Sequence, residues 1–300
     1  MLRWRWLRIT LLPTWLGLSA LVAAGGVWAQ TVVIYPRSES PTDNRYTYDY
    51  DLLRLALEKT VAEFGPYELR QSTAVMNQAR AAEEIMSGDS GINIFVRSTS
   101  IEHEHALLPI RIPVEKGLFS YRVFLIRADA QARFAAVRTL DELRRYSVGS
   151  MPTWVDTAIL RRGGFQVVTG DNYEGLFKML VAGRFDFFSR SVDEAYREYD
   201  ERKRVLPELK VENTILLYFP TTRYFFVQRS AQGERLAKRV ERGLNLMIED
   251  GSFDAHFRKF KGPLIERAQL SKRKLFRIPN PYMSPETPLH RRELWFQALP

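Results

Sequence analysis

Two arginines and one short turn are the parts of this sequence whose residue types could bind an anion. Arg97 directly follows the apolar run 92–96, and Arg190 comes two residues after the run 184–188. A guanidinium pairs with a carboxylate or phosphate through two parallel hydrogen bonds, so either arginine could hold a charged solute. Each could instead be a surface arginine whose side chain points into solvent.

The turn 149–157 (GSMPTWVDT) has further residues that suit an anion. A helix that begins in this turn would offer unpaired backbone amides and a partial positive charge. Thr153, Asp156 and Thr157 are candidate contacts, although Thr153 or Asp156 could simply cap the helix. Trp154 lies on a turn that contains glycine and proline, where an indole would make a stacking wall for a ligand.

Few other residues of the sequence are candidates for binding or catalysis. His103 and His105 alternate with acids in the run 102–105 and would share one face of a strand. No further metal ligand lies nearby, so we expect a solvated loop there and no metal site. Tyr48, with Tyr46, could line the mouth of a cleft or pack internally. Cysteine is absent, and no phosphate loop, serine elbow or zinc-protease motif occurs, so the sequence predicts no cofactor.

Residues 1–29 predict a secretory signal peptide. Three arginines precede the apolar run 11–27, and the small-residue end at 27–29 is typical of a cleavage site. An uncleaved membrane anchor is the alternative, because the run approaches the length that spans a bilayer. Cleavage lowers the formal charge from +9 to +6 and predicts a periplasmic protein. An exported chain seldom meets nucleic acid, so we expect its basic residues to be solvated surface charge and predict no nucleic-acid partner.

The alternation of β-rich runs with amphipathic helical segments predicts an α/β fold with two lobes. A first series covers residues 31–96, and a second begins after the longer β-rich segment 119–126. Joins near residues 125 and 220 predict two hinge strands. We expect strands at 31–35, 67–71, 92–96, 119–126, 147–149, 166–168, 184–188, 214–218 and 224–228, and helices at 49–64, 76–86, 140–146, 154–162, 173–181, 192–199 and 233–249.

This layout resembles the type 2 periplasmic solute-binding proteins, which serve ABC importers of amino acids and related solutes. The segments that carry the resemblance are 140–148 (LDELRRYSV), 173–186 (YEGLFKMLVAGRFD) and 246–260 (LMIEDGSFDAHFRKF). The resemblance implies the two-lobed periplasmic-binding-protein type 2 fold with two hinge strands. The expected parts are a signal peptide at 1–29, lobe 1 at 30–125 plus 221–262, lobe 2 at 126–220, and a surface tail at 263–300 anchored by Leu294, Trp295 and Phe296.

The resemblance also implies ligand contacts. In amino-acid binders of this family, an arginine of lobe 1 clamps the ligand carboxylate and a strand-to-helix turn of lobe 2 holds the anionic end. Arg97 and the turn 149–157 match those positions. A carboxylate five residues after the aspartate of a G-[KR]-x-D turn pairs with the ligand's amino group, but counting from Asp186 reaches Ser191, beside Arg190. Because an unpaired buried ammonium is unfavourable, we expect an acidic or amine-free ligand.

The sequence therefore predicts a monomeric solute-binding protein that closes two lobes over a small molecule. The expected partner is the permease of an ABC importer, and a sensor protein is the alternative. An enzyme on the same fold, such as a dehydratase, is a second alternative. Asp156 or Glu39 would then supply the acid. We expect the chain to be no enzyme and assign no catalytic residue.

Overall fold

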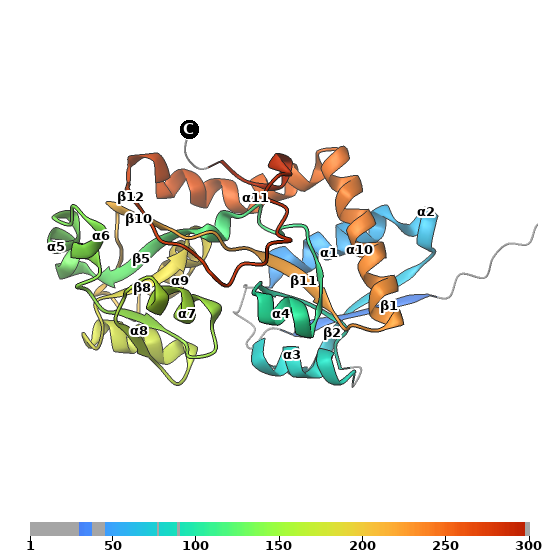
Figure 1. Cartoon of the computed structure of the whole chain (residues 1–300), viewed down its shortest axis with the longest axis horizontal. Helices are drawn as coiled ribbons and strands as arrows, with labels where there is room; N and C mark the ends of the chain where they lie inside the picture. Colours follow the sequence, from blue (N-terminus) through green and yellow to red (C-terminus); the bar gives the residue numbers. More distant parts are fainter. Residues whose placement is uncertain (1–29, 38–45, 77, 89–90, 298–300) are drawn as a thin grey trace, which may run out of the picture.

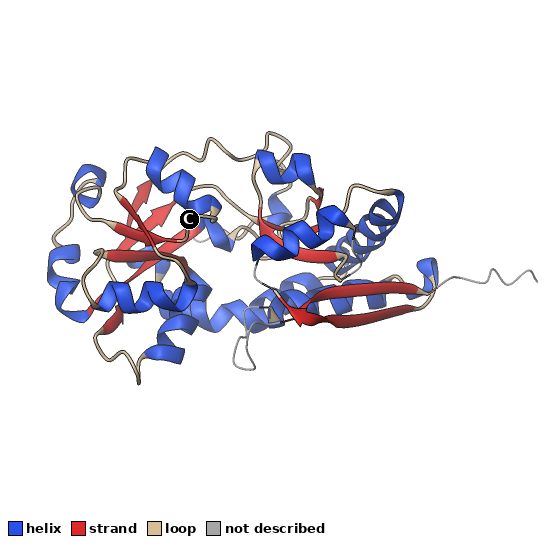
Figure 2. Cartoon of the chain, turned by 90° about the horizontal axis from the view of Figure 1, so that it is seen from below, coloured by secondary structure: helices blue, strands red, loops and turns tan. Residues whose placement is uncertain are grey.

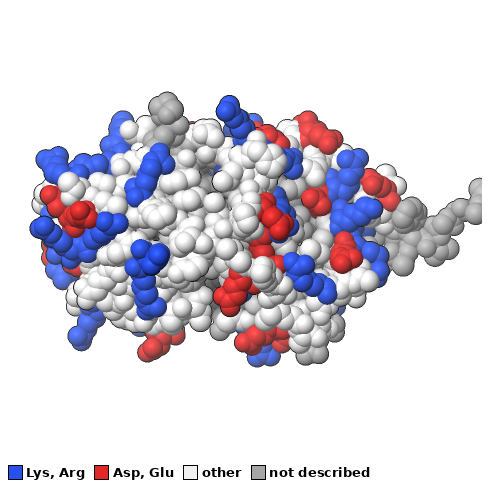
Figure 3. All heavy atoms as spheres, in the orientation of Figure 1, with Lys and Arg blue, Asp and Glu red and all other residues white. Residues whose placement is uncertain are grey.

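Two lobes joined side by side make up the part of the chain that the computed structural model describes, which is residues 30–37, 46–76, 78–88 and 91–297 (Figure 1). The predicted signal peptide and Glu39 lie outside these residues. None of the helices in these residues has an apolar stretch of the length that spans a bilayer. Figure 3 shows Lys and Arg side chains spread over one face of both lobes and mixed with Asp and Glu, as is typical of solvated surface charge.

Lobe 1 is built on five strands that form two hydrogen-bonded groups. β1 pairs in parallel with β2, while β11 lies between β3 and β4 and runs antiparallel to both. Asn93 joins the groups, because its backbone N–H donates to the Ile34 carbonyl at 3.0 Å and its side-chain oxygen accepts from the Ile34 N–H at 2.8 Å. The strands are β1 (Thr31–Arg37), β2 (Tyr67–Val75), β3 (Ile94–Ser98), β4 (Leu108–Ile110) and β11 (Arg223–Val227).

Three helices of lobe 1, at residues 47–59, 78–87 and 231–249, bury apolar residues in its core. α10 is the longest, and its Leu236, Val240 and Leu244 recur at helical spacing and are buried in the lobe 1 core. Gly243 lets α10 approach α1, because a Cβ there would lie 2.0 Å from the Ala56 carbonyl oxygen. The helices are α1 (Thr47–Lys59), α2 (Val61–Phe64), α3 (Gln78–Ser87), α4 (Ile101–Ala106) and α10 (Ala231–Glu249).

Lobe 2 is a mixed sheet in the order β12-β10-β5-β8-β6-β7, with β9 also paired to β5 and helices packed around it (Figure 2). β6 is parallel to β7 and β8, as expected where helices connect successive strands. The strands are β5 (Tyr121–Arg127), β6 (Val148–Ser150), β7 (Val167–Thr169), β8 (Phe187–Ser191), β9 (Leu209–Val211), β10 (Ile215–Tyr218) and β12 (Lys274–Arg277); the helices are α5 (Gln131–Ala135), α6 (Leu140–Leu143), α7 (Val155–Arg162), α8 (Tyr173–Val181) and α9 (Val192–Arg202).

The chain crosses between the lobes at 111–120 and again at 219–222. The two crossings are joined directly, because the Ser120 hydroxyl donates to the Thr221 carbonyl at 2.6 Å and accepts from the Thr221 N–H at 3.0 Å. α11 (Ser252–Ala268) makes a third connection: Phe253 packs in the lobe 1 core and Phe257 in a lobe 2 core. These connections place residues from both lobes around one space.

The C-terminal residues return from lobe 2 to lobe 1 across these crossings. After β12, the Asn280 side chain donates to the Pro220 carbonyl at 2.8 Å, and the Tyr282 carbonyl accepts from the Ile101 N–H at 2.9 Å. Leu294 is then fully buried in the lobe 1 core, and the Phe296 N–H donates to the Lys116 carbonyl at 2.6 Å. The segment expected as a surface tail therefore starts inside α11 and contacts both lobes.

The α/β, two-lobed architecture predicted from the sequence is confirmed. The expected loop at 102–105 is instead part of α4, which begins because the Ser100 hydroxyl accepts from the His103 N–H at 3.1 Å. Glu104 is buried in that helix and accepts from Thr99 at 2.6 Å. In a helix, residues two apart point to different sides, so His103 and His105 share no face. No group of three possible metal ligands occurs among the described residues.

Candidate functional site

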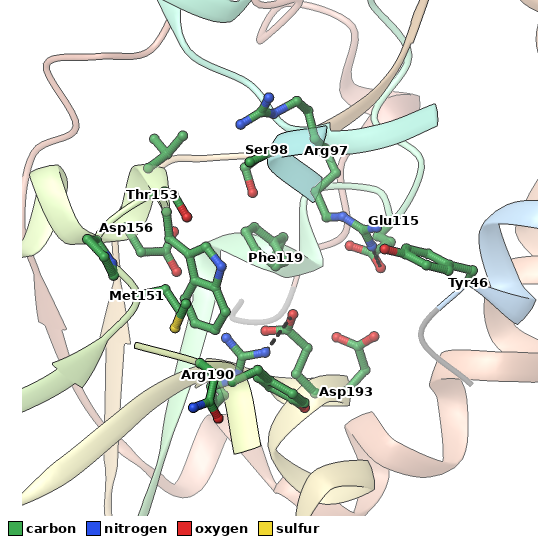
Figure 4. Close-up of a pocket in the computed structure, with 18 of the residues that line it drawn as sticks. Tyr46, Arg97, Ser98, Glu115, Phe119, Met151, Thr153, Asp156, Arg190 and Asp193 are labelled. Atoms are coloured by element: carbon green, nitrogen blue, oxygen red, sulfur yellow. Dashed lines mark hydrogen bonds and ion pairs between the residues drawn. The ribbon is translucent and has the colours of Figure 1, made fainter. Parts of the chain in front are cut away.

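A cavity of about 390 Å³ lies between the two lobes (Figure 4). Lobe 1 supplies the end of β3 and the crossing segment before β5, while lobe 2 supplies the turn before α7 and the first two turns of α9. Side chains of arginine, carboxylate and aromatic type meet here. The lining residues that the argument uses are Arg97, Glu115, Phe119, Thr153, Trp154, Asp156, Arg190, Asp193, Glu194, Arg197 and Arg223.

Arg97 stands at the end of β3 and is half-buried on the lobe 1 side of the cavity. Its guanidinium has no hydrogen bond or ion pair with any of the described residues. Burial lowers the pKa of Arg97 to about 10, which leaves it protonated at neutral pH. An unpaired guanidinium that lines a cavity is available to bind an anion.

Arg223 also lines the cavity, but two acids of lobe 1 hold it. Its Nη2 donates to Asp49 at 2.6 Å and its Nη1 to Glu115 at 2.7 Å. Although burial opposes protonation, these carboxylates raise the pKa of Arg223. Arg223 therefore fixes the positions of Asp49 and Glu115 and carries little free charge.

The turn before α7 forms the opposite wall. Trp154 precedes the first residue of α7, and its indole lies parallel to the Phe188 ring, with centroids 6.1 Å apart and an interplanar angle of 9°. The Arg190 guanidinium lies 4.7 Å from the centre of the Trp154 ring. Stacking on Phe188 and Arg190 holds the indole in place as a wall of the cavity.

Arg190 is buried and paired with two acids of α9. Its Nη2 donates to Glu198 Oε1 at 2.7 Å and its Nε to Glu198 Oε2 at 2.9 Å, while Glu194 Oε1 lies 3.0 Å from Nη2. Burial opposes protonation, but the two glutamates raise the pKa of Arg190. This arginine stabilises the packing of α9 on β8 and offers a ligand no free charge.

Asp156 is held in the same way by Arg122. The two carboxylate oxygens lie 3.1 Å and 3.0 Å from the two terminal nitrogens of that arginine, which is fully buried. Arg122 also stacks on Phe119, with its Cζ 3.9 Å from the ring centre. Burial raises the pKa of Asp156 and Arg122 opposes that rise. The carboxylate therefore has no oxygen free of an internal partner.

Comparisons with known proteins identify the fold. No family model matches the sequence, and no curated protein matches it either. Among solved structures, an ancestral arginine-binding protein bound to glutamine matches with a TM-score of 0.57 at 15% identity, over 78% of this chain and 99% of that one. A histidine kinase sensor domain with similarity to periplasmic binding proteins matches with a TM-score of 0.55 at 17% identity, over 78% and 97%. A Salmonella typhimurium periplasmic binding protein of high arginine specificity matches at 0.55 and 12%, over 77% and 99%.

This chain has the type 2 periplasmic-binding-protein fold. The identities are low, so the likeness concerns the fold and leaves the ligand open. In this periplasmic-binding-protein fold, the cavity described above lies where the two lobes face each other. The resemblance inferred from the sequence is thus confirmed for the architecture.

Six of the residues selected from the sequence line this cavity: Tyr46, Arg97, Thr153, Trp154, Asp156 and Arg190. The other three lie outside its lining, where each makes a hydrogen bond within the protein. Thr157 donates to the Met151 carbonyl at 2.6 Å and so closes the turn. Ser191 is fully buried and caps α9, and the Tyr48 hydroxyl donates to the Val114 carbonyl at 2.6 Å within lobe 1.

Several lining residues escaped the sequence analysis. Glu194, which lines the cavity, and Glu198, which lies outside its lining, are four residues apart in α9. Their positions four and eight residues after Arg190 could have predicted their ion pairs with it. Glu115, Phe119 and Arg223 offered no such signal, because the first two come from a crossing segment and Arg223 from the start of β11, far away along the chain.

Proposed function

We propose that this chain is a periplasmic solute-binding protein that captures a small anionic solute between its lobes. The free guanidinium of Arg97 is the observation that carries the proposal. Of the arginines lining the cavity in the described part of the chain, Arg190 and Arg223 are paired with buried acids, and Arg197 has Glu201 at 3.7 Å. Arg97 alone among them lacks an acid within ion-pair distance, so an anion from outside would complete its pairing.

The shape of the cavity supports a small organic anion. The indole of Trp154 lines the cavity. Phe119 forms another part of the lining (Figure 4). A planar or apolar portion of the solute would pack against these rings while its acidic group contacts Arg97. The acidic or amine-free ligand inferred from the sequence remains part of this proposal, now with Arg97 as its anion contact.

Delivery to the permease of an ABC importer is the role we favour for the loaded protein. Sensing is the second candidate, because one similar structure is a histidine kinase sensor domain. Genes beside this one would separate the two: a permease and an ATPase would favour import, and a sensor kinase would favour signalling.

We propose no catalytic activity. The one described acid that we considered as a catalytic group, Asp156, has both oxygens on Arg122, and breaking that buried pair to move a proton would be unfavourable. An Asp156→Asn variant that loses turnover of a bound solute while retaining its binding would contradict this part of the proposal.

Thermal melting with a panel of solutes tests the proposed function. Dicarboxylates, hydroxy acids, keto acids, aromatic acids and amino acids would be compared with neutral sugars. A ligand that binds only the folded state raises the melting temperature, and at 100 times its Kd it adds about 2.7 kcal/mol. We expect at least one anion to raise the midpoint and to titrate with a stoichiometry of one. Shifts with sugars alone, or with no solute, would contradict the proposal.

A further inference from the structure

Lys261 is a buried lysine that joins the acids of the two lobes behind the cavity wall. It projects from α11, and its side chain is only 6% exposed. Its Nζ lies 3.3 Å from Glu115 Oε1 of lobe 1 and also donates to Asp193 Oδ2 of lobe 2. Both acids line the cavity, whereas Lys261 does not. The ammonium group of Lys261 thus pairs with carboxylates that could otherwise bind an amino group of the solute.

Each carboxylate oxygen of the acids at the start of α9 already has a partner within the chain, so a ligand cation would have to share it. Asp193 accepts from Ser191 at 2.8 Å through Oδ1 and from Lys261 through Oδ2. Although burial opposes it, Lys261 keeps the pKa of Asp193 well below its usual range. Glu194 places Oε1 3.0 Å from Arg190 and accepts from the Ser191 N–H at 3.1 Å through Oε2. Each oxygen of these two acids is therefore occupied by the chain.

Glu115 differs, because one of its oxygens lacks a partner in the described structure. Oε1 contacts two cations, Arg223 at 2.7 Å and Lys261 at 3.3 Å. Oε2 is buried and has no hydrogen-bond partner in the described structure. An O–H group could donate to Oε2, whereas a third cation beside Arg223 and Lys261 would be repelled by both. Of the two remaining lining acids, Asp156 is paired with Arg122. Asp171 is exposed, so water weakens its attraction for a cation.

We propose that Lys261 acts as a built-in ammonium that makes the cavity select solutes without an amino group. The preferred solute is a hydroxycarboxylate, whose carboxylate contacts Arg97 and whose hydroxyl donates to Glu115 Oε2. Figure 4 shows Arg97, Phe119 and Glu115 around the same opening. This inference rests on the proposed function and adds the chemical class of its ligand. Lys261 is a positioning and specificity-determining residue, since it acts on the solute through Glu115 and Asp193.

Matched pairs of acids test the selection directly. The pairs share one carbon skeleton and differ only in hydroxyl or amino group: glycolate and glycine, lactate and alanine, malate and aspartate, 2-hydroxyglutarate and glutamate, 3-phenyllactate and phenylalanine. Isothermal titration of the wild-type protein would give a Kd for each. For a pair that binds, we expect the hydroxy acid to bind about tenfold or more tightly than its amino partner, a difference of about 1.4 kcal/mol.

Substitution of Lys261 should reverse the preference. Lys261→Met keeps the aliphatic stem and removes the ammonium, so Glu115 and Asp193 would gain from an amino group on the solute. We expect the ratio of the two Kd values to move toward the amino acid by about tenfold or more. Lys261→Arg keeps the charge and should keep the wild-type preference. Lys259→Met, at an exposed lysine of the same helix, is the matched control and should change nothing.

The outcomes separate this inference from the proposed function. An amino acid that binds the wild type as tightly as its hydroxy partner overturns the inference and leaves anion capture intact. If other anions bind but no hydroxy acid does, the inference is also overturned and anion capture remains intact. A folded Lys261→Met protein with an unchanged Kd ratio also overturns it. If Lys261→Met does not fold, the wild-type pairs and Lys261→Arg still decide. If no anion binds at all, both proposals are wrong.

Discussion

Arg97 and Arg190 line the same cavity from opposite lobes, yet they differ in what holds their charge. Arg190 contacts Glu194 and Glu198, and its guanidinium stacks on Trp154. Arg97 has none of the described acids within ion-pair distance. The position of the two arginines does not reveal this difference, because both follow a β-rich run; the only hint in the sequence is the pair of glutamates four and eight residues after Arg190. An arginine that is paired with an acid of the chain stabilises the fold, whereas an arginine without such an acid can bind an anionic ligand.

The largest effect should come from removing the paired arginine. Arg190→Met leaves Glu198, which is fully buried, without its counter-charge. Breaking a buried ion pair by removing one partner lowers the free energy of unfolding by about 3–5 kcal/mol. Denaturant titration of the wild type and the variant would measure the loss.

Arg54→Met is the matched control for that experiment. Arg54 also contacts two acids, Asp51 and Glu58, but on the exposed surface of α1. Exposed ion pairs contribute about 0–1 kcal/mol, so this variant should remain close to the wild type. Equal losses for Arg190→Met and Arg54→Met would show that burial of the Arg190 pair does not matter.

The unpaired arginine should show the opposite pattern. Arg97→Met removes no internal ion pair, so we expect the free energy of unfolding to stay within about 0.5 kcal/mol of the wild type. Its effect should appear in binding, where a hydrogen bond to a charged group contributes about 2 kcal/mol, or about 30-fold in Kd. Titration with the anion that gives the largest melting shift measures this. Arg97→Lys keeps the charge but loses the bidentate geometry, so its Kd should fall between the two.

If Arg97→Met binds the anion as tightly as the wild type, Arg97 does not contact the ligand. The proposed contrast between Arg97 and Arg190 would then be wrong. A loss of stability in Arg97→Met as large as that in Arg190→Met would also contradict the contrast. That result would mean that Arg97 has a structural partner after all.

Local patterns in the sequence predicted most of the elements but not the ion pairs that fill the cavity. The helix expected at 173–181 is α8 with the same bounds, because an asparagine cap and a glycine turn frame its apolar face. By contrast, α11 continues through Pro263 to Ala268, and its packing against both lobes overrides the local preference to end there. Packing of that kind depends on residues distant in sequence.

The same reasoning explains what was missed at the site. Arg190 was selected as a cation facing the ligand, but its charge is matched by acids one and two turns into the following helix. Lys261 was not selected at all, since nothing near it in sequence is chemically unusual. Its role arises because α11 brings it between Glu115 and Asp193, which lie 146 and 68 residues away along the chain.

His103 gives an effect that appears only as the pH falls, and it tests the surroundings of Arg97. Its ring lies 3.0 Å from the Ser98 carbonyl through Nδ1, and burial, together with the nearby Arg97 charge, lowers the pKa of His103 from 6.5 to about 4. The folded state therefore favours the neutral ring, and the unfolded state binds the proton first as the pH falls. The contribution of His103 is fully present above pH 6.5 and is lost progressively between 6.5 and 4.

Comparing the pH dependence of unfolding for the wild type and His103→Gln measures that contribution. Glutamine can still donate to the Ser98 carbonyl but does not titrate, so the variant should lose less stability between pH 6.5 and 4. The difference in slope should stay below about 1.4 kcal/mol per pH unit, the limit for one proton. His256, whose pKa burial also lowers, titrates in both proteins and cancels. His105→Gln, at an exposed histidine of α4, should follow the wild type. Parallel curves for wild type and His103→Gln would mean that the imidazole of His103 is solvated. Arg97, which lies close to it, would then differ from Arg190 in its exposure to water as well as in its lack of an acidic partner.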